Sequence, residues 1–143
     1  PASLRTLINH KGHEGTPRNQ VQVTATNRPG MTADEVSHAV ITAAMKVHSA
    51  LGPGLLESAY EACLQHELRK MGLKSEAQVE LPVVYDSIKL DLGYRIDLLV
   101  EDLVIVELKS VEALTAVHQA QILSYLKLSG KSLGCSLTST SLT

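Results

Sequence analysis

Apolar residues recur at helical spacing in three segments of the chain. The first segment follows Thr32-Ala-Asp-Glu35, which has the sequence of a capping box, and it stops at Gly52-Pro53. The second segment ends at Gly72 and the third at Gly130. The pattern therefore predicts helices over residues 36–51, from about 55 to 71 and from about 115 to 128.

Between the second and third helices, β-branched residues and short apolar runs predict strands. Val79–Tyr85 and Lys89–Val100 are joined by a turn at Asp86-Ser87, and Pro82 points to an edge position or a bulge. Leu103–Ser110 contains the run Val-Ile-Val, which predicts a buried strand at the centre of a sheet.

The two ends of the chain have a different composition from the region between them. Residues 1–30 are rich in Asn, Gly, Thr, Pro and His without apolar periodicity, so we expect a disordered or non-native extension ahead of Met31. The predicted domain covers residues 31–134. Residues 135–143 form an atypical Ser/Thr-rich tail that offers little apolar surface, and a polar edge strand is the most structure we expect there.

Three charged residues interrupt the two most apolar strands. Asp97 lies in the first of them, and Glu107 and Lys109 lie two apart in the next, so they share a face. A three-residue loop would pair Val100 with Val104 and place Asp97 opposite Glu107. A two-residue loop would send the two carboxylates to opposite faces. We predict the first register, or a bulge with the same effect.

Two carboxylates and an ammonium group that converge on one face predict a divalent-metal site with a cation beside it, because burying unpaired charges is costly. Such a site is the minimal equipment for hydrolysing a phosphodiester. The alternative is a surface hairpin with an ordinary Glu–Lys salt bridge, since the pattern is short and common. The apolar surroundings of Glu107 and Lys109 favour the metal site.

Two helical pairs are further candidates. Glu57 and Tyr60 lie three apart at the start of the second helix and share a face. Gln121 and Tyr125 lie four apart on the third helix, where an amide and a hydroxyl could hold a phosphate or brace the metal ligands. The alternatives are structural: Glu57 would stabilise the helix dipole, Tyr60 would be a core aromatic, and the last pair would be a polar stripe.

Charge and cysteine content narrow the function classes. The 143 residues have a formal net charge of −2, and residues 1–30 hold four basic residues against one acidic residue, so the remainder carries −5. Broad electrostatic affinity for nucleic acid is therefore not expected without metal ions. Cys63 and Cys135 form neither a metal-ligand spacing nor a disulfide framework. No apolar run is long enough to span a bilayer, so we expect a cytoplasmic protein without a membrane partner.

Four short motifs, taken together, resemble those of a prokaryotic family. From about Val36 to Gly134 the chain resembles the GxxExxY proteins, a bacterial and archaeal group of the PD-(D/E)xK nuclease superfamily. The motifs stand in the order and spacing of that family, although its members continue after Gly134 with an apolar strand. The matching segments are Gly54-x-x-Glu57-x-x-Tyr60, Arg95-Ile-Asp97, Val106-Glu107-Leu-Lys109 and Gln121-Ile-Leu-Ser-Tyr125.

The resemblance implies an α/β fold with a restriction-endonuclease-like core, in which helices flank a mixed central β-sheet. It implies that Asp97 and Glu107 bind Mg²⁺ or Mn²⁺, with Glu57 as a further ligand or water holder. Lys109 would orient or activate the attacking water, or stabilise the charge that develops.

The resemblance also assigns supporting or substrate-contacting roles to Tyr60, Gln121 and Tyr125. The implied partner is nucleic acid, with DNA favoured over RNA, and a homodimer is left open. The implied function is metal-dependent phosphodiester hydrolysis. One alternative is a nuclease fold kept as a binding or regulatory module without turnover, and another is an α/β domain whose charged strand residues are structural.

Overall fold

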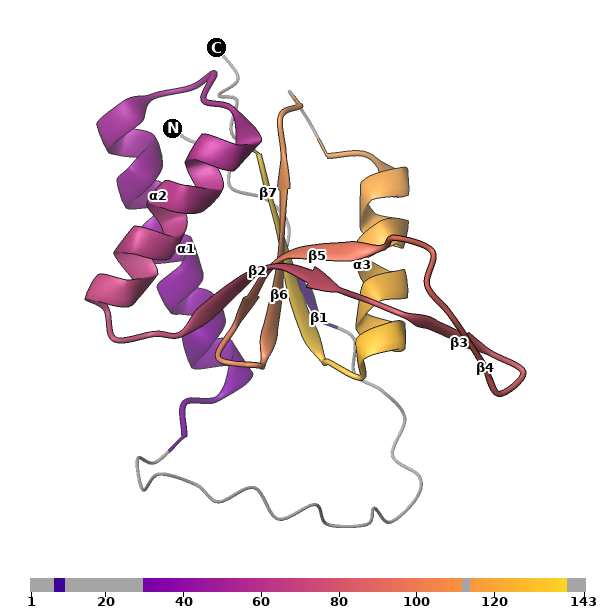
Figure 1. Ribbon diagram of the computed structural model, residues 1–143. Coiled ribbons are helices and arrows are strands. Elements are labelled where there is room, and N and C mark those ends of the chain that lie inside the picture. Colours follow the sequence, from indigo (N-terminus) through magenta and orange to yellow (C-terminus); the bar gives the residue numbers. More distant parts are fainter. Residues whose placement is uncertain (1–6, 10–29, 112–113, 139–143) are drawn as a thin grey trace.

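The computed structural model describes residues 7–9, 30–111 and 114–138 (Figure 1). Within these ranges the chain forms three helices and seven strands. The helices are α1 (Ala33–Leu51), α2 (Glu57–Lys70) and α3 (Ala116–Ser129). The strands are β1 (Leu7–Asn9), β2 (Ser75–Glu80), β3 (Val83–Tyr85), β4 (Ile88–Leu90), β5 (Arg95–Val100), β6 (Val104–Lys109) and β7 (Leu133–Thr138).

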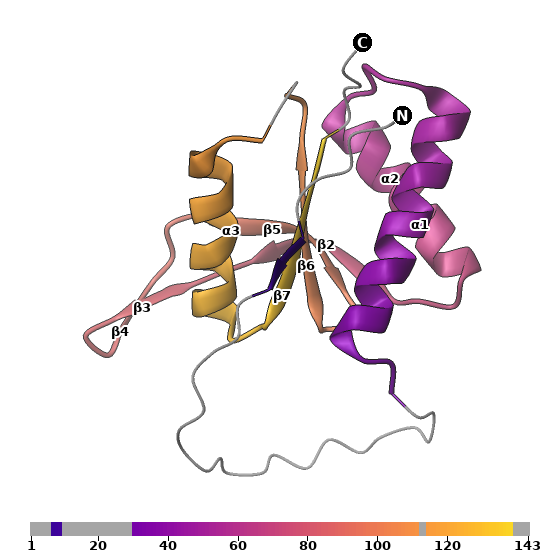
Figure 2. The ribbon, with the colours of Figure 1, turned by 180° about the vertical axis from the view of Figure 1, so that it is seen from behind.

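Five of the strands form one mixed sheet between two layers of helices. The strand order is β1-β7-β6-β5-β2, with β6 and β7 parallel and the other neighbours antiparallel. Helices α1 and α2 cover one face of the sheet and α3 covers the other (Figures 1 and 2). The predicted α/β fold, with β6 at the centre of the sheet, is confirmed. No helix in the described part of the chain is long and apolar enough to cross a membrane.

The start and the end of α1 are set by local sequence, as predicted. The Thr32 hydroxyl accepts a hydrogen bond from the Glu35 N–H at 3.2 Å, and the Glu35 carboxylate accepts one from the Thr32 N–H at 2.8 Å. This reciprocal pair satisfies two of the N–H groups that a helix start leaves without partners. The helix ends at Gly52, whose φ of +72° suits glycine.

The sheet has an apolar core on each face, because side chains alternate along its central strands. Leu98, Val104 and Val106 face α1 and α2. Leu99 and Ile105 face α3 and pack with Ile122, Tyr125 and Leu126 of that helix. Glu107 lies two residues from Ile105, so the strand period places its carboxylate on the α3 face. Asp97 lies opposite Glu107 on β5, next to Ile96, which also packs with the α3 residues.

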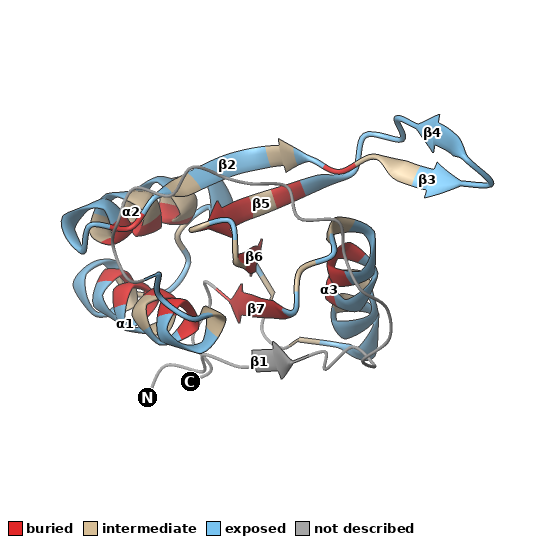
Figure 3. Cartoon of the chain, turned by 90° about the horizontal axis from the view of Figure 1, so that it is seen from below, coloured by how far each residue is buried: buried red, intermediate tan, exposed pale blue. Residues whose placement is uncertain are grey.

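The two long strands predicted before Glu101 are each broken in two. Pro82 separates β2 from β3, as expected from its missing N–H. The predicted turn at Asp86-Ser87 is confirmed, with φ of +50° and +62° at these residues. The resulting β3–β4 hairpin is a separate two-stranded sheet that projects from the body of the protein and is largely exposed (Figure 3).

The predicted fate of the C-terminal segment is wrong. Residues 133–138 form β7, which lies inside the sheet between β6 and β1 and is buried throughout. Cys135 and Leu137 supply the apolar surface towards α1 and α2, so the strand needs apolar residues only at alternate positions. Its partner β1 lies within the segment 1–30 that we expected to be disordered. Residues 1–6 and 10–29 of that segment, and residues 139–143, lie outside the described residues.

Candidate functional site

The β5–β6 hairpin sets the register of the two strand carboxylates. Glu101 and Asp102 form its turn with φ of +52° and +56°, and the Leu103 N–H donates to the Val100 carbonyl at 3.0 Å. Val100 pairs with Val104, so the loop has the predicted three residues. The sequence-based register is therefore confirmed, and it brings Asp97 opposite Glu107.

Asp97 and Glu107 hold each other through the backbone. The Asp97 N–H donates to Glu107 Oε1 at 3.2 Å, and the Leu108 N–H donates to Asp97 Oδ2 at 2.8 Å. Glu107 is only 3% exposed, whereas Asp97 is half-buried. The two carboxylates are thus fixed at one place before any ligand arrives, which lowers the entropy cost of binding one.

Burial and the neighbouring carboxylate change the ionisation of Glu107. Burial is the larger cause, and together with the negative charge of Asp97 it raises the pKa of Glu107 from 4.5 to about 8. The Asp97 N–H and the Lys109 ammonium act in the opposite direction, but they are outweighed. Glu107 therefore holds a proton at neutral pH in the metal-free protein. Two adjacent carboxylates repel each other when both are charged. A divalent cation would offset this repulsion, so the pair suits such an ion.

Lys109 lies beside the pair as the sequence predicted. Its Nζ is 3.9 Å from Glu107 Oε2, and its side chain is 21% exposed. A lysine that is partly open to solvent at this distance can contact both Glu107 and a ligand that approaches from outside.

The neighbouring strand β7 adds two hydroxyl residues that the sequence analysis did not assign to the site. In the parallel register Ser136 lies beside Glu107, and Thr138 lies beside Lys109. Both are buried, at 3% and 5% exposure. Paired residues of neighbouring strands project to the same face. The unusual Ser/Thr content of this segment therefore places polar groups next to the charged ones.

The structure does not bring Glu57 together with the two strand carboxylates. Glu57 is exposed at the first residue of α2, and its Oε1 accepts a hydrogen bond from the Ser110 N–H at 2.7 Å. Across residues 7–9, 30–111 and 114–138, no three His, Cys, Asp or Glu side chains are placed to hold one metal ion. In this arrangement Glu57 fastens α2 to the end of β6.

A different carboxylate of α2, Glu61, is affected by the charge of Asp97. Glu61 is half-buried, and burial is the main reason that its pKa is raised. The charge of Asp97 raises it further, while a hydrogen bond from Gln78 Nε2 at 2.9 Å lowers it. Glu61 lies one helical turn after Glu57, and this i,i+4 spacing was the only sequence signal for it.

Tyr60 is a core residue, as its structural alternative predicts. The side chain is 1% exposed and packs with α1, where its hydroxyl donates to the Ala44 carbonyl at 3.0 Å. Burial raises the pKa of Tyr60 to about 12. The Gly-x-x-Glu-x-x-Tyr spacing therefore has a structural explanation. Gly54, with φ of +86°, lies just before α2, Glu57 is its first residue, and Tyr60 packs the helix against α1.

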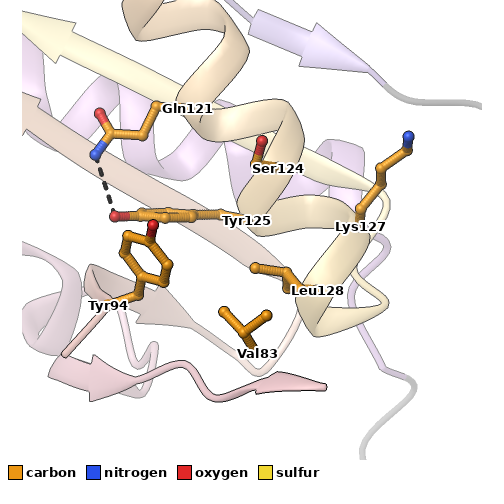
Figure 4. Close-up of a pocket in the computed structure, with 7 residues that line it drawn as sticks. All are labelled: Val83, Tyr94, Gln121, Ser124, Tyr125, Lys127 and Leu128. Carbon is orange, nitrogen blue, oxygen red and sulfur yellow. Dashed lines mark hydrogen bonds between the residues drawn. The ribbon is translucent and has the colours of Figure 1, made fainter. Parts of the chain in front are cut away.

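Gln121 and Tyr125 share a face of α3, as predicted. Gln121 Nε2 donates to the Tyr125 hydroxyl at 3.1 Å (Figure 4). Burial is the main cause of the raised pKa of Tyr125, and the charges of Glu107 and Asp97 contribute to it. Tyr125 also packs with Ile105, two residues before Glu107 on β6.

The fold and this site define a class of protein. A mixed sheet between helices, with an Asp on one central strand and a Glu-x-Lys on the next, is the arrangement that names the PD-(D/E)XK nucleases. A family model of the PD-(D/E)XK nuclease superfamily matches residues 34–139, well over half of the chain, and the protein belongs to this superfamily. Its fold is accordingly restriction-endonuclease-like. No curated protein and no solved structure matches the chain significantly.

Proposed function

We propose that this protein hydrolyses phosphodiester bonds in nucleic acid, with Mg²⁺ or Mn²⁺ held by Asp97 and Glu107. The observation that carries the proposal is the buried Glu107 carboxylate, which lies against Asp97 and within 3.9 Å of the Lys109 ammonium. Membership of the nuclease superfamily supports a nucleic acid as the substrate. Of the two nucleic acids, we propose DNA in preference to RNA.

Each residue of the site has a distinct task in this proposal. Asp97 and Glu107 would hold a divalent cation through their oxygen atoms, and Glu107 would release its proton to solvent on binding it. The cation would supply Lewis-acid chemistry, which lowers the pKa of water and offsets the charge of the phosphate. Lys109 orients the nucleophile or donates to the charge that develops on the phosphate.

The α3 and α2 side chains support this centre. Tyr125, held by Gln121, offers a hydroxyl beside the carboxylates for hydrogen bonding to a phosphate oxygen. We assign to Glu61, the α2 carboxylate whose pKa is raised in part by the charge of Asp97, the role of holding a water at this centre. Glu57 keeps the end of β6 in position through Ser110.

The alternative is a domain that binds nucleic acid without cleaving it. The absence of a third converging metal-ligating side chain among the described residues favours this alternative. The two functions differ in what they require of Lys109. Cleavage needs its ammonium group, whereas a domain that only binds a metal ion and nucleic acid needs the carboxylates but not this group for the metal.

Cleavage assays on the full chain test the proposal. The protein is incubated with labelled single- and double-stranded DNA and RNA in Mg²⁺ or Mn²⁺, alongside Lys109→Ala and Asp97→Asn. Lys89→Ala serves as the control, since Lys89 is an exposed lysine on β4. We expect cleavage by the wild type and the control only. Metal-dependent cleavage that survives in Lys109→Ala would contradict the mechanism, and binding without any cleavage would favour the alternative.

A further inference from the structure

A pocket opens between α3, β3 and the residues just before β5 (Figure 4). Its volume is about 450 Å³, within the range of ~300–1,000 Å³ that is typical of small-molecule sites. Val83 and Leu128 give it apolar walls, and Tyr94 and Tyr125 contribute two aromatic rings. Its size and aromatic lining therefore suit a flat ligand with apolar faces.

The two tyrosines differ in their availability to a ligand. Their ring centroids are 6.2 Å apart with an interplanar angle of 57°. Tyr125 is 6% exposed and its hydroxyl is bonded to Gln121, whereas Tyr94 is 45% exposed. Tyr94 consequently presents ring surface that a bound molecule can cover.

The pocket adjoins the proposed site of cleavage. Tyr94 lies three residues before Asp97, next to the start of β5. Tyr125 lines the pocket and packs in the same cluster as Ile105, which lies two residues before Glu107 on β6. A nucleotide whose phosphate lies at Asp97 and Glu107 therefore has its base, or that of the next nucleotide, within reach of this pocket.

We propose that the pocket takes an unpaired nucleobase, with Tyr94 as its stacking platform, so that the substrate is a single-stranded segment of nucleic acid. This inference rests on the proposed nuclease function and specifies its substrate. Bases inside a duplex are stacked and paired, and they can enter such a pocket only from a single strand or after being flipped out. Base stacking is also insensitive to net charge. Stacking can therefore contribute affinity for nucleic acid although the net charge of −5 on residues 31–143 disfavours electrostatic binding.

The polar residues of the pocket fit the same ligand. Gln121 and Ser124 line it and offer groups that can hydrogen bond to a base edge. Lys127 lines it from α3, and its ammonium points away from the two rings (Figure 4). In that position it is available to a backbone phosphate rather than to the base itself.

Binding measurements with Lys109→Ala, which we expect to leave bound strands uncut, test this inference. Labelled strands of about eight nucleotides, in DNA and RNA forms, are compared with the same strands in duplexes. A further set has one abasic position that is moved along the strand. We expect single strands to bind more tightly than duplexes, and added Tyr94→Ala to weaken single-strand binding about tenfold.

Matched variants separate stacking from damage to the fold. Tyr94→Phe keeps the ring and should bind like the parent chain. Tyr85→Ala removes an exposed tyrosine of the β3–β4 hairpin outside the pocket, and it should also bind like the parent. One abasic position should weaken binding to the parent chain but not to Tyr94→Ala, because the two changes remove the same contact.

The outcomes distinguish this inference from the proposed function on which it rests. Single-strand binding that is unchanged by Tyr94→Ala, or by every abasic position, would overturn the base pocket alone. If no strand binds and the wild type cleaves nothing in Mn²⁺, both proposals fail. The DNA and RNA arms show whether the pocket accepts one sugar or both.

Discussion

Removing the ionisable group at Glu107 should change how stability depends on pH. In metal-free buffer the pKa of Glu107 is raised from 4.5 to about 8, chiefly by burial. Between these values the folded state holds a proton that the unfolded state has lost, so stability falls as pH rises. At about 1.4 kcal/mol for each pKa unit, the free energy of unfolding should fall by about 4 kcal/mol from pH 4.5 to pH 8 through this residue.

The variant Glu107→Gln lacks this titration, because its side chain stays neutral throughout. Near pH 4.5 the variant and the wild type should have similar stability, and at pH 8 the variant should be about 4 kcal/mol more stable. Urea unfolding at several pH values in a chelating buffer measures the difference. Glu80→Gln, a change at an exposed carboxylate on β2, is the control and should follow the wild type.

Two results would refute this reasoning. One is that the unfolding free energies of the wild type and Glu107→Gln run parallel from pH 4.5 to pH 8. The other is that excess Mg²⁺ or Mn²⁺ fails to stabilise the wild type at pH 8, where a bound cation should replace the proton.

Three further substitutions test the packing that supports the site. Tyr60→Phe removes the buried hydrogen bond to the Ala44 carbonyl and should cost about 1 kcal/mol in urea unfolding, without altering metal-dependent stabilisation. Gly134→Ala would place a Cβ 2.7 Å from Ile122 Cδ1, and we expect a loss of about 1–3 kcal/mol. That loss should shrink when Ile122→Ala is also present, and an equal loss in both backgrounds would contradict the clash. Gly54→Ala has open space around it but a φ of +86°, so thermal unfolding should show a cost of about 1–2 kcal/mol from backbone strain alone.

The register of the central hairpin could be predicted from the sequence because a strand has a period of two. With one face already committed to Val104 and Val106, only a loop that pairs Val100 with Val104 keeps Asp97 and Glu107 together. The constraint is local in sequence and involves a single turn. The same holds for the start of α1, where the capping box is contained in four residues.

The contribution of α2 could not be predicted in this way. Which of its acids is affected by the charge of Asp97 depends on how the helix is rotated against α1. That rotation is set by tertiary contacts, including Tyr60 with Ala44 and the burial of Leu64. Glu57 and Glu61 lie four residues apart on the same helix face, so the sequence does not distinguish their roles. Only the packed structure does.

The C-terminal strand was misjudged because its composition was interpreted without its register. Ser136 and Thr138 make the segment appear too polar for an interior strand. They lie beside Glu107 and Lys109, where a polar face is needed, while Cys135 and Leu137 fill the opposite core. Tyr94 could not be identified from sequence at all, since its partner Tyr125 is 31 positions away on another element.

Thermal unfolding of the full chain with and without millimolar Mn²⁺ or Mg²⁺ tests the central claim, a metal site at Asp97 and Glu107, most directly. We expect the wild type to melt about 5–10 °C higher when the cation is near a hundred times its dissociation constant. Asp97→Asn should lose this rise. Asp102→Asn should keep it, because that aspartate lies exposed in the hairpin turn and pairs with Lys131. A rise that persists in Asp97→Asn, or none in the wild type, would contradict the metal site.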